Sequence, residues 1–214
     1  MTNHLYFSDL FRLHGLHGSE WFPQSMFDLL GDAQRKWVQS ILVKLGETKQ
    51  LGDRFPRATF CGPVYVADDV QVEPTAMIVG PTYVGPGSTI RHGAYIRGNV
   101  YLGAECVVGH ATEVKDSVFL DGAKAAHFAY LGNSVLGNQV NLGAGTKVAN
   151  LRLDRQPVKI THPVTGERLA TGEKKMGAWI GDGAQTGCNS VLSPGTILRP
   201  NAIVMPCEHV SGTR

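Results

Sequence analysis

A histidine, a tyrosine and two basic side chains stand in this sequence at positions where they could act on one substrate. Arg97 and Lys115 are 18 residues apart, and His127 and Tyr130 follow in a short segment. Guanidinium binds phosphate through two parallel hydrogen bonds, and ammonium adds a compact charge. Histidine is the side chain that most often removes a proton during catalysis. If the fold brings these groups together, they predict a site that binds an anionic substrate and deprotonates it.

The spacing of apolar residues predicts the elements that position these groups. Large apolar side chains, and finally an alanine, occupy every sixth position: Phe60, Val66, Val72, Ile78, Val84, Ile90, Ile96, Leu102, Val108, Val114, Leu120 and Ala126. A smaller set stands four residues after each: Val64, Val70, Ala76, Thr82, Ser88, Ala94, Val100, Cys106, Thr112 and Val118. Residues six apart stay on one face of a strand, because six is a multiple of the two-residue period, but they do not stay on one face of a helix. With Gly and Pro at the remaining positions, it predicts a β-helix of hexapeptide repeats, an all-β fold.

The repeat continues towards the C-terminus with one interruption. Two five-residue steps are expected after residue 126, to Leu131 and Leu136. Regular six-residue spacing resumes at Leu142 and Val148. After a polar stretch it returns at Ile180, Thr186, Leu192, Leu198 and Val204. We therefore expect one β-helix domain over residues 53–214, from which the loop 151–175 is inserted. Loops of that length in a compact repeat are usually functional or disordered.

Three hexads per coil would place residues 18 apart directly above one another, about 4.8 Å along the axis. Arg97 and Lys115 are such a pair, and both follow an inward residue, so both point outward. Tyr130 precedes Leu131 one coil higher. We therefore expect the two cations and Tyr130 to form one column, with His127 near the corner that leads into this face. Asn141 is expected on the face of His127, one coil further along.

Ordinary surface roles remain open for these side chains. Stacked cations repel each other unless an anion lies near, but on a solvated surface the repulsion costs little. A lone histidine is more often a surface or interface residue than a base. A phosphate bound between Arg97 and Lys115 and a general base at His127 are therefore one interpretation, and solvated charge is the other.

Residues 1–52 do not follow the six-residue rule. Asp32 followed by apolar residues at helical spacing up to Leu45, and then Gly46, predicts a capped amphipathic helix. Pro23 before an apolar cluster predicts a shorter helix ahead of it. We expect this segment to cover the open end of the solenoid, to contact another subunit, or both.

Composition excludes several classes of protein. The net charge of +2 over 214 residues is too small to favour nucleic acid or an anionic membrane as a partner. No apolar run reaches membrane-spanning length, and the N-terminus lacks the pattern of a signal peptide, so a cytoplasmic protein is expected. Four dispersed cysteines form no CxxC pair and are expected to be reduced.

Several motifs resemble one known family. The run 124–132 reads KAAHFAYLG, the run 141–146 reads NLGAGT, and both Ile96-Arg97 and the 113–115 segment EVK stand at matching distances upstream. These motifs resemble the acetyltransferase half of bifunctional glucosamine-1-phosphate acetyltransferase/N-acetylglucosamine-1-phosphate uridyltransferase. The run 150–154, NLRLD, is closer to the archaeal bifunctional sugar-1-phosphate enzymes. The resemblance covers about residues 60–206 and implies a left-handed β-helix.

The resemblance also implies roles for individual residues. His127 would be the general base that takes a proton from a sugar amine, and Arg97 and Lys115 would hold the sugar phosphate. Tyr130, Asn141 and Asn150 would position the sugar and the thioester. Ala144 and Cys188 would line the groove for acetyl-CoA, and the active sites would form between the subunits of a homotrimer. No covalent enzyme intermediate is needed, so Cys188 is expected to line the groove and not to act as a nucleophile.

The sequence also departs from that family. The loop lysine of the family aligns with Gln156, so Lys159 or Arg155 is expected to replace it in binding the substrate. The stretch 161–175 is longer than usual. No Gly-rich segment followed by Arg and Pro precedes the repeats, so uridyl transfer is not expected. The predicted activity is acetyl transfer from acetyl-CoA to glucosamine 1-phosphate or galactosamine 1-phosphate.

Three other functions stay open. One is a zinc carbonic anhydrase of the γ type, for which His92 and His127 are suitably spaced but the third expected histidine is Gly132, so no metal site is predicted. Another is an acyltransferase that acts on a nucleotide-linked amino sugar. The last is a non-catalytic binding or scaffold protein, because fold alone implies no function.

Overall fold

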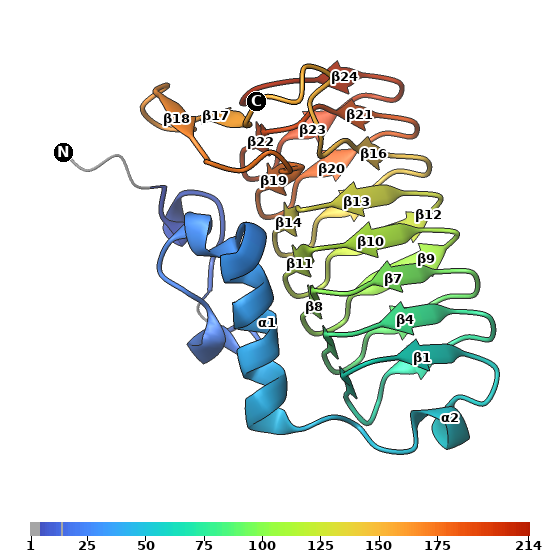
Figure 1. The fold of residues 1–214 in the computed structure, drawn as a ribbon. Coiled ribbons are helices and arrows are strands. Elements are labelled where there is room, and N and C mark those ends of the chain that lie inside the picture. The colour runs from blue at the N-terminus through green and yellow to red at the C-terminus, as the bar shows by residue number, and fades with distance from the viewer. Residues whose placement is uncertain (1–4, 14) are drawn as a thin grey trace.

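The computed structural model describes residues 5–13 and 15–214 as a left-handed parallel β-helix flanked by an N-terminal helical segment (Figure 1). Three parallel sheets form the sides of the prism. The first face contains β1 (Thr59–Cys61), β4 (Met77–Val79), β7 (Tyr95–Arg97), β10 (Glu113–Lys115), β13 (Tyr130–Gly132), β16 (Lys147–Val148), β21 (Val191–Leu192) and β24 (His209–Val210). The second contains β2 (Val64–Val66), β5 (Thr82–Val84), β8 (Val100–Leu102), β11 (Ser117–Phe119), β14 (Val135–Leu136), β19 (Ala178–Ile180) and β22 (Thr196–Leu198). The third contains β3 (Gln71–Val72), β6 (Thr89–Ile90), β9 (Val107–His110), β12 (Lys124–His127), β15 (Asn141–Leu142), β20 (Gln185–Thr186) and β23 (Ile203–Val204).

The inward-facing positions shift by one residue, and this shift occurs earlier in the chain than the sequence predicts. Phe119 pairs with Leu102, 17 residues before it, and is fully buried in the core of the solenoid. Leu120, the predicted inward residue, lies instead in a separate apolar cluster beneath the N-terminal segment. The first five-residue step therefore runs from Val114 to Phe119, and the prediction that it follows Ala126 was wrong.

The same shift changes the neighbouring inward positions. Ala125 pairs with Val108 and is fully buried, whereas Ala126 is half-buried. Ser117, not Val118, fills the smaller inward position and is fully buried in the interior. The second five-residue step, which ends at Leu136, is where the sequence predicts it.

A shorter corner causes the shift. Two residues, Gly98 and Asn99, separate β7 from β8, whereas Asp116 alone separates β10 from β11. Asp116 adopts a φ of 45° to turn the chain in that space. Phe119 and Leu120 are both large and apolar, so either could fill an inward position and the spacing alone could not choose between them.

The N-terminal segment covers the second face. It contains η1 (Phe7–Asp9), η2 (Ser19–Trp21), η3 (Met26–Leu29), α1 (Gly31–Leu45) and α2 (Leu51–Arg54). The outward side chains of this face are aromatic and aliphatic, and Tyr83 stacks on Tyr101 with ring centroids 4.9 Å apart. Helix α1 buries Val38, Ile41 and Leu42, a spacing that forms one apolar stripe against this surface.

Helix α1 therefore lies along the flank of the solenoid and ends at Leu45 before Gly46, as predicted (Figure 1). The prediction that Asp32 caps its start was wrong, because the helix begins at Gly31 and Asp32 lies in its first turn. The part of this segment that reaches the solenoid core is Leu51 of α2, beside β1 at the open end. The division of the chain between residues 52 and 53, and a contact of this segment with another subunit, stay predictions. No helix in the described part of the chain is long and apolar enough to cross a membrane.

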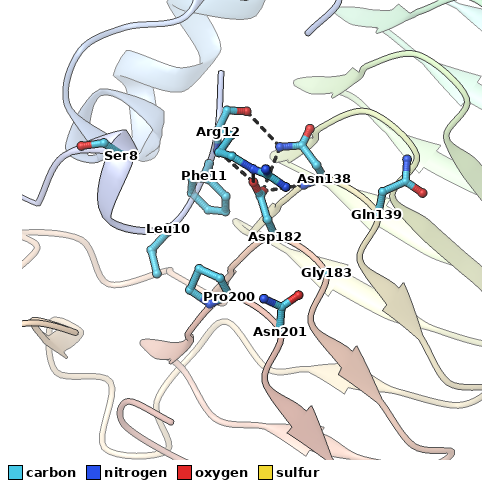
Figure 2. A pocket seen from close by; sticks show the side chains of 10 residues that line it. All are labelled: Ser8, Leu10, Phe11, Arg12, Asn138, Gln139, Asp182, Gly183, Pro200 and Asn201. Atoms are coloured by element: carbon cyan, nitrogen blue, oxygen red, sulfur yellow. Dashed lines mark hydrogen bonds and ion pairs between the residues drawn. The ribbon is translucent and has the colours of Figure 1, made fainter. Parts of the chain in front are cut away.

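Asp182 attaches the N-terminal segment to the coils, as Figure 2 shows beside a cavity of about 500 Å³. Its carboxylate accepts hydrogen bonds from the backbone N–H groups of Arg12 and Asn138, each at 2.8 Å, and from the Asn138 side chain at 2.9 Å. Asp121 repeats this arrangement lower on the same corner, where it accepts from the backbone N–H of His17 at 2.9 Å. The extended N-terminal chain is thus hydrogen-bonded to the solenoid at two levels.

The inserted loop forms a β-hairpin. An isolated bridge between Leu151 and Lys175 closes its base, and the solenoid resumes with β19. Within the loop, β17 (Lys159–Thr161) pairs antiparallel with β18 (Arg168–Ala170). The guanidinium of Arg199 donates to the carbonyl of Pro163 and so fixes the hairpin turn.

Candidate functional site

His127 belongs to a row of corner residues between the third and first faces. It pairs in register with His110, and the ring of His110 stacks on that of His92 with centroids 4.1 Å apart. Extension of the β12–β15 and β15–β20 registers places Ala144 above His127, and Cys188 above Ala144. We call His127, Ala144 and Cys188 the corner row.

Hydrogen bonds between coils confirm the order of the corner row. The N–H of Gly145 donates to the carbonyl of His127 at 3.0 Å, and the N–H of Asn189 donates to the carbonyl of Ala144 at 2.8 Å. His127 is exposed and does not point into the aliphatic core. The predicted base and the two residues predicted to line the coenzyme groove therefore lie on one line, one coil apart.

Arg97 and Lys115 lie on the first face in adjacent coils, as the sequence predicts. The structure pairs each cation with a carboxylate of its own chain. Arg97 is 2.6 Å from Glu113, and Lys115 is 3.0 Å from Asp116. Glu113 and Asp116 therefore supply the anionic neighbours of the stacked cations, and the role of Arg97 and Lys115 in binding a phosphate stays a prediction.

Asp116 is the most buried charge in this network, with 6% of its side chain exposed. Besides Lys115 it contacts Arg35 of α1 at 3.4 Å and accepts a hydrogen bond from Asn99 at 2.9 Å. A buried carboxylate needs several such partners, since desolvation opposes its charge. The network therefore orients the Lys115 side chain, 18% of which is exposed.

Tyr130 does not continue the column of Arg97 and Lys115. It pairs with Glu113 below and Lys147 above, whereas Lys115 pairs with Gly132. The prediction of a single column was wrong, because Tyr130 precedes its inward neighbour Leu131, whereas Arg97 and Lys115 follow theirs, so Tyr130 lies two positions away along the strand. Tyr130 still shares the outer surface of the first face with both cations.

The Tyr130 hydroxyl donates to the side-chain carbonyl of Asn150 at 3.4 Å, and the Asn150 amide donates to Asn133 at 2.7 Å. Partial burial raises the pKa of Tyr130, and the nearby Glu113 carboxylate adds to the rise, so the phenol stays protonated as a donor. Two of the predicted substrate-binding residues, Tyr130 and Asn150, are therefore in contact.

Gly132 leaves the space in which Tyr130 and Asn150 meet. A Cβ at this position would lie 2.4 Å from the Asn150 side-chain nitrogen and 3.0 Å from the Tyr130 hydroxyl. Gly132→Ala is therefore expected to separate the two side chains and to cost about 1 kcal/mol of substrate binding, roughly a fivefold rise in KM. Steady-state kinetics would check this, with Gly52→Ala in α2, where an added Cβ meets nothing within 4 Å, as the control. An unchanged KM would contradict a role for this contact in binding.

Asn141 and Lys159 lie apart from Tyr130 and Asn150. Asn141 is exposed on the third face, where it pairs with Lys124. Lys159 is exposed on β17 and lines a groove with the inserted loop. Within one chain the structure therefore does not bring either residue to Tyr130, and their roles stay predictions.

Three residues of this region carry interactions that the sequence analysis did not assign: Glu113, Asp116 and Asn133. The outward position of Glu113 beside the cations could have been predicted, since it is two residues from Lys115 and shares its outward direction. Asp116 and Asn133 sit at corners, where the direction of a side chain does not follow from strand periodicity. Among the described residues, no group of three or more His, Cys, Asp or Glu could hold a metal ion.

Comparisons with known proteins bear on this geometry. Residues 78–175 match the family model described as GMPPB C-terminal domain. Over 87 residues the chain is 41% identical to the bifunctional sugar-1-phosphate nucleotidylyltransferase/acetyltransferase of Sulfurisphaera tokodaii, a match that covers 41% of this chain and 21% of the relative. Over 81 residues it is 37% identical to the bifunctional protein GlmU of Methanococcus vannielii, covering 38% and 19%. The putative uncharacterized acetyltransferase YaiX of Escherichia coli is 38% identical over 77 residues, covering 36% and 33%.

The matches span about a fifth of the length of the two bifunctional relatives. A solved structure, the acetyltransferase domain of PglB from Neisseria gonorrhoeae, aligns with a TM-score of 0.40 and 15% identity over 83% of this chain and 62% of that one. The comparisons confirm the resemblance drawn from the sequence: the repeat domain is similar to acyltransferases, namely the bifunctional sugar-1-phosphate enzymes and other acetyltransferases.

Proposed function

We propose that this chain transfers the acetyl group of acetyl-CoA to the amine of an amino-sugar 1-phosphate, with His127 as the general base. The corner row is the observation that carries the proposal. It places an exposed imidazole at one end of a straight line of small side chains, Ala144 and Cys188, along which an extended thioester can lie.

The chemistry balances with these groups. The sugar amine attacks the thioester carbonyl, and His127 takes the proton that the nitrogen loses as the C–N bond forms. The tetrahedral centre then collapses, the C–S bond breaks, and the departing thiolate receives a proton from the imidazolium. Such proton transfer typically contributes about 10²–10⁴-fold.

Ala144 is the candidate donor for the oxyanion. The backbone N–H groups of residues 143–145 are all candidates from the sequence, and the hydrogen bonds of the fold distinguish among the three. The N–H of Gly143 donates to Thr186 at 2.8 Å, and that of Gly145 donates to His127. In the described chain the Ala144 N–H is the one of the three with no backbone acceptor in a neighbouring coil, and it lies next to His127 in the corner row. A donor aimed at the developing oxyanion would lower the barrier to attack.

The two halves of the proposed site lie at opposite ends of the strands of the first face. His127 precedes β13, whereas Arg97 and Lys115 end β7 and β10. A neighbouring copy that packs its first-face edge against the corner row would bring the cations to the base. We therefore propose a homotrimer with sites between subunits, as the related bifunctional family implies.

A thiol-release assay with glucosamine 1-phosphate and galactosamine 1-phosphate tests the proposal. Release of free CoA that depends on either sugar, with formation of the N-acetyl product, would support it. Absence of CoA release with both sugars, with unphosphorylated amino sugars and with nucleotide-linked amino sugars would overturn it in favour of a binding or scaffold role.

Lys115→Ala is expected to weaken binding of the phosphorylated sugar by about 1–3 kcal/mol, because a charged hydrogen bond is lost. Arg35 and Asn99 still contact Asp116 in this variant, so the corner is expected to stay folded. KM would be compared for glucosamine 1-phosphate and glucosamine, with Lys124→Ala on the third face as the control. An equal loss for both sugars would contradict the assignment of Lys115 to phosphate.

A further inference from the structure

A groove of about 670 Å³ lies between the inserted hairpin and the last coils. Its base is the row that continues upward from Arg97 and Lys115. In register, Lys115 is followed by Gly132, and extension of the next strand pairs adds the side chains of Ala149, Ser193 and Ser211. The row thus changes from long cations to small residues, and these small residues leave the groove open.

The hairpin forms the wall of this groove, and its two faces differ. Ile160 and Leu169 are buried against the outer apolar cluster, with 1% and 8% exposed. Because side chains alternate along a strand, Lys159, Thr161 and Arg168 point the other way, and all three line the groove.

Besides the Arg199–Pro163 hydrogen bonds, two further contacts hold the hairpin against the coils. Gly195 permits the close approach, because a Cβ there would lie 2.7 Å from the Val158 side chain and 2.8 Å from the carbonyl of Lys159. The Thr213 hydroxyl donates to the carbonyl of Thr161 at 2.5 Å. The wall that carries Lys159 is therefore fixed by the fold.

The cations of the groove differ in their partners. Arg152 donates to Asp154 from two nitrogens, one of them at 2.8 Å, and this pairing lowers the pKa of Asp154 to about 2. Lys159 and Arg168 form no ion pair with any residue that the structure describes. Two uncompensated cations on one rigid face, with a threonine hydroxyl between them, form an anion-binding arrangement.

We propose that this groove binds a phosphoryl or diphosphoryl group of an extended small molecule, with Lys159, Arg168 and Thr161 as its ligands. The volume suits a ligand larger than phosphate alone. The inference does not depend on acetyl transfer. Both a phosphorylated sugar and the phosphates of coenzyme A carry the required chemistry.

Isothermal titration calorimetry with inorganic pyrophosphate tests the proposal on the whole chain. Lys159→Gln and Arg168→Gln are each expected to weaken binding about tenfold, as expected when a charged hydrogen bond is lost. Lys174→Gln, an equal change of charge in the same loop but outside the groove, is the matched control. Affinity that is equal in wild type and both groove variants, or lowered as much by Lys174→Gln, would overturn the proposal.

Competition identifies the source of the anion. Displacement of pyrophosphate by glucosamine 1-phosphate but not by coenzyme A would assign the groove to the sugar substrate, and the reverse would assign it to the coenzyme. Displacement by neither, with binding that still depends on Lys159 and Arg168, would support a site for a different phosphorylated ligand. None of these measurements requires turnover, so an inactive protein would leave the test of the groove intact.

Discussion

Replacement of His127 by alanine is expected to lower acetyl transfer by about 10²–10⁴-fold. The side chain is exposed and ends the corner row, so its removal takes away the proposed proton acceptor without opening the core. The loss should fall on kcat, because the base acts on a proton that is released only as the tetrahedral centre forms. Thiol-release kinetics at saturating acetyl-CoA would measure it.

His110→Ala provides a matched control for His127→Ala. His110 occupies the same corner one coil earlier, and its ring stacks on His92 without contact to Ala144. We expect this variant to remain active, and circular dichroism should show the same β-rich spectrum for both proteins. Full activity of His127→Ala would remove His127 as the base. Equal losses of activity in the two variants would show that His127 has no specific role as a base and contributes only to the shape of the surface.

The fold could be predicted because the six-residue repeat leaves few choices. Once coils of three hexads are assumed, Arg97 and Lys115 must be neighbours, and the exposed corner position of His127 follows from the same repeat. Ala144 and Cys188 came from the family resemblance, and the structure adds that both share the row of His127. These relations depend only on register, which backbone hydrogen bonds fix.

The remaining features depend on packing choices that a repeat does not encode. The shorter corner at Asp116 depends on one residue, and it makes Phe119 the inward side chain in place of Leu120. The carboxylate of Glu113 compensates Arg97, a pairing that side-chain spacing permits but does not require. Helix α1 covers the second face because the outward side chains of that face are apolar. The six-residue pattern describes only the inward side chains, so it does not predict these aromatic residues.

Phe119→Ala is expected to lower the free energy of unfolding by about 3–5 kcal/mol, because it leaves a cavity in a closely packed core. Phe119 has no exposed surface and is one of the largest fully buried side chains of the chain. It fills the interior at the level where the coil shortens by one residue. Chemical denaturation monitored by circular dichroism would measure the loss.

Leu120→Ala separates the observed register from the one that the sequence predicts. Leu120 is buried to a similar degree, but it belongs to the cluster beneath the N-terminal segment. Hydrogen exchange is therefore expected to rise in different places. Leu120→Ala should expose the amides of Arg12 and His17, which bond to Asp182 and Asp121, whereas Phe119→Ala should expose the amides of β8 and β14 that flank β11. If the two variants exchanged these patterns, Leu120 would be the inward residue, and the position of Ala125 would have to be assigned again.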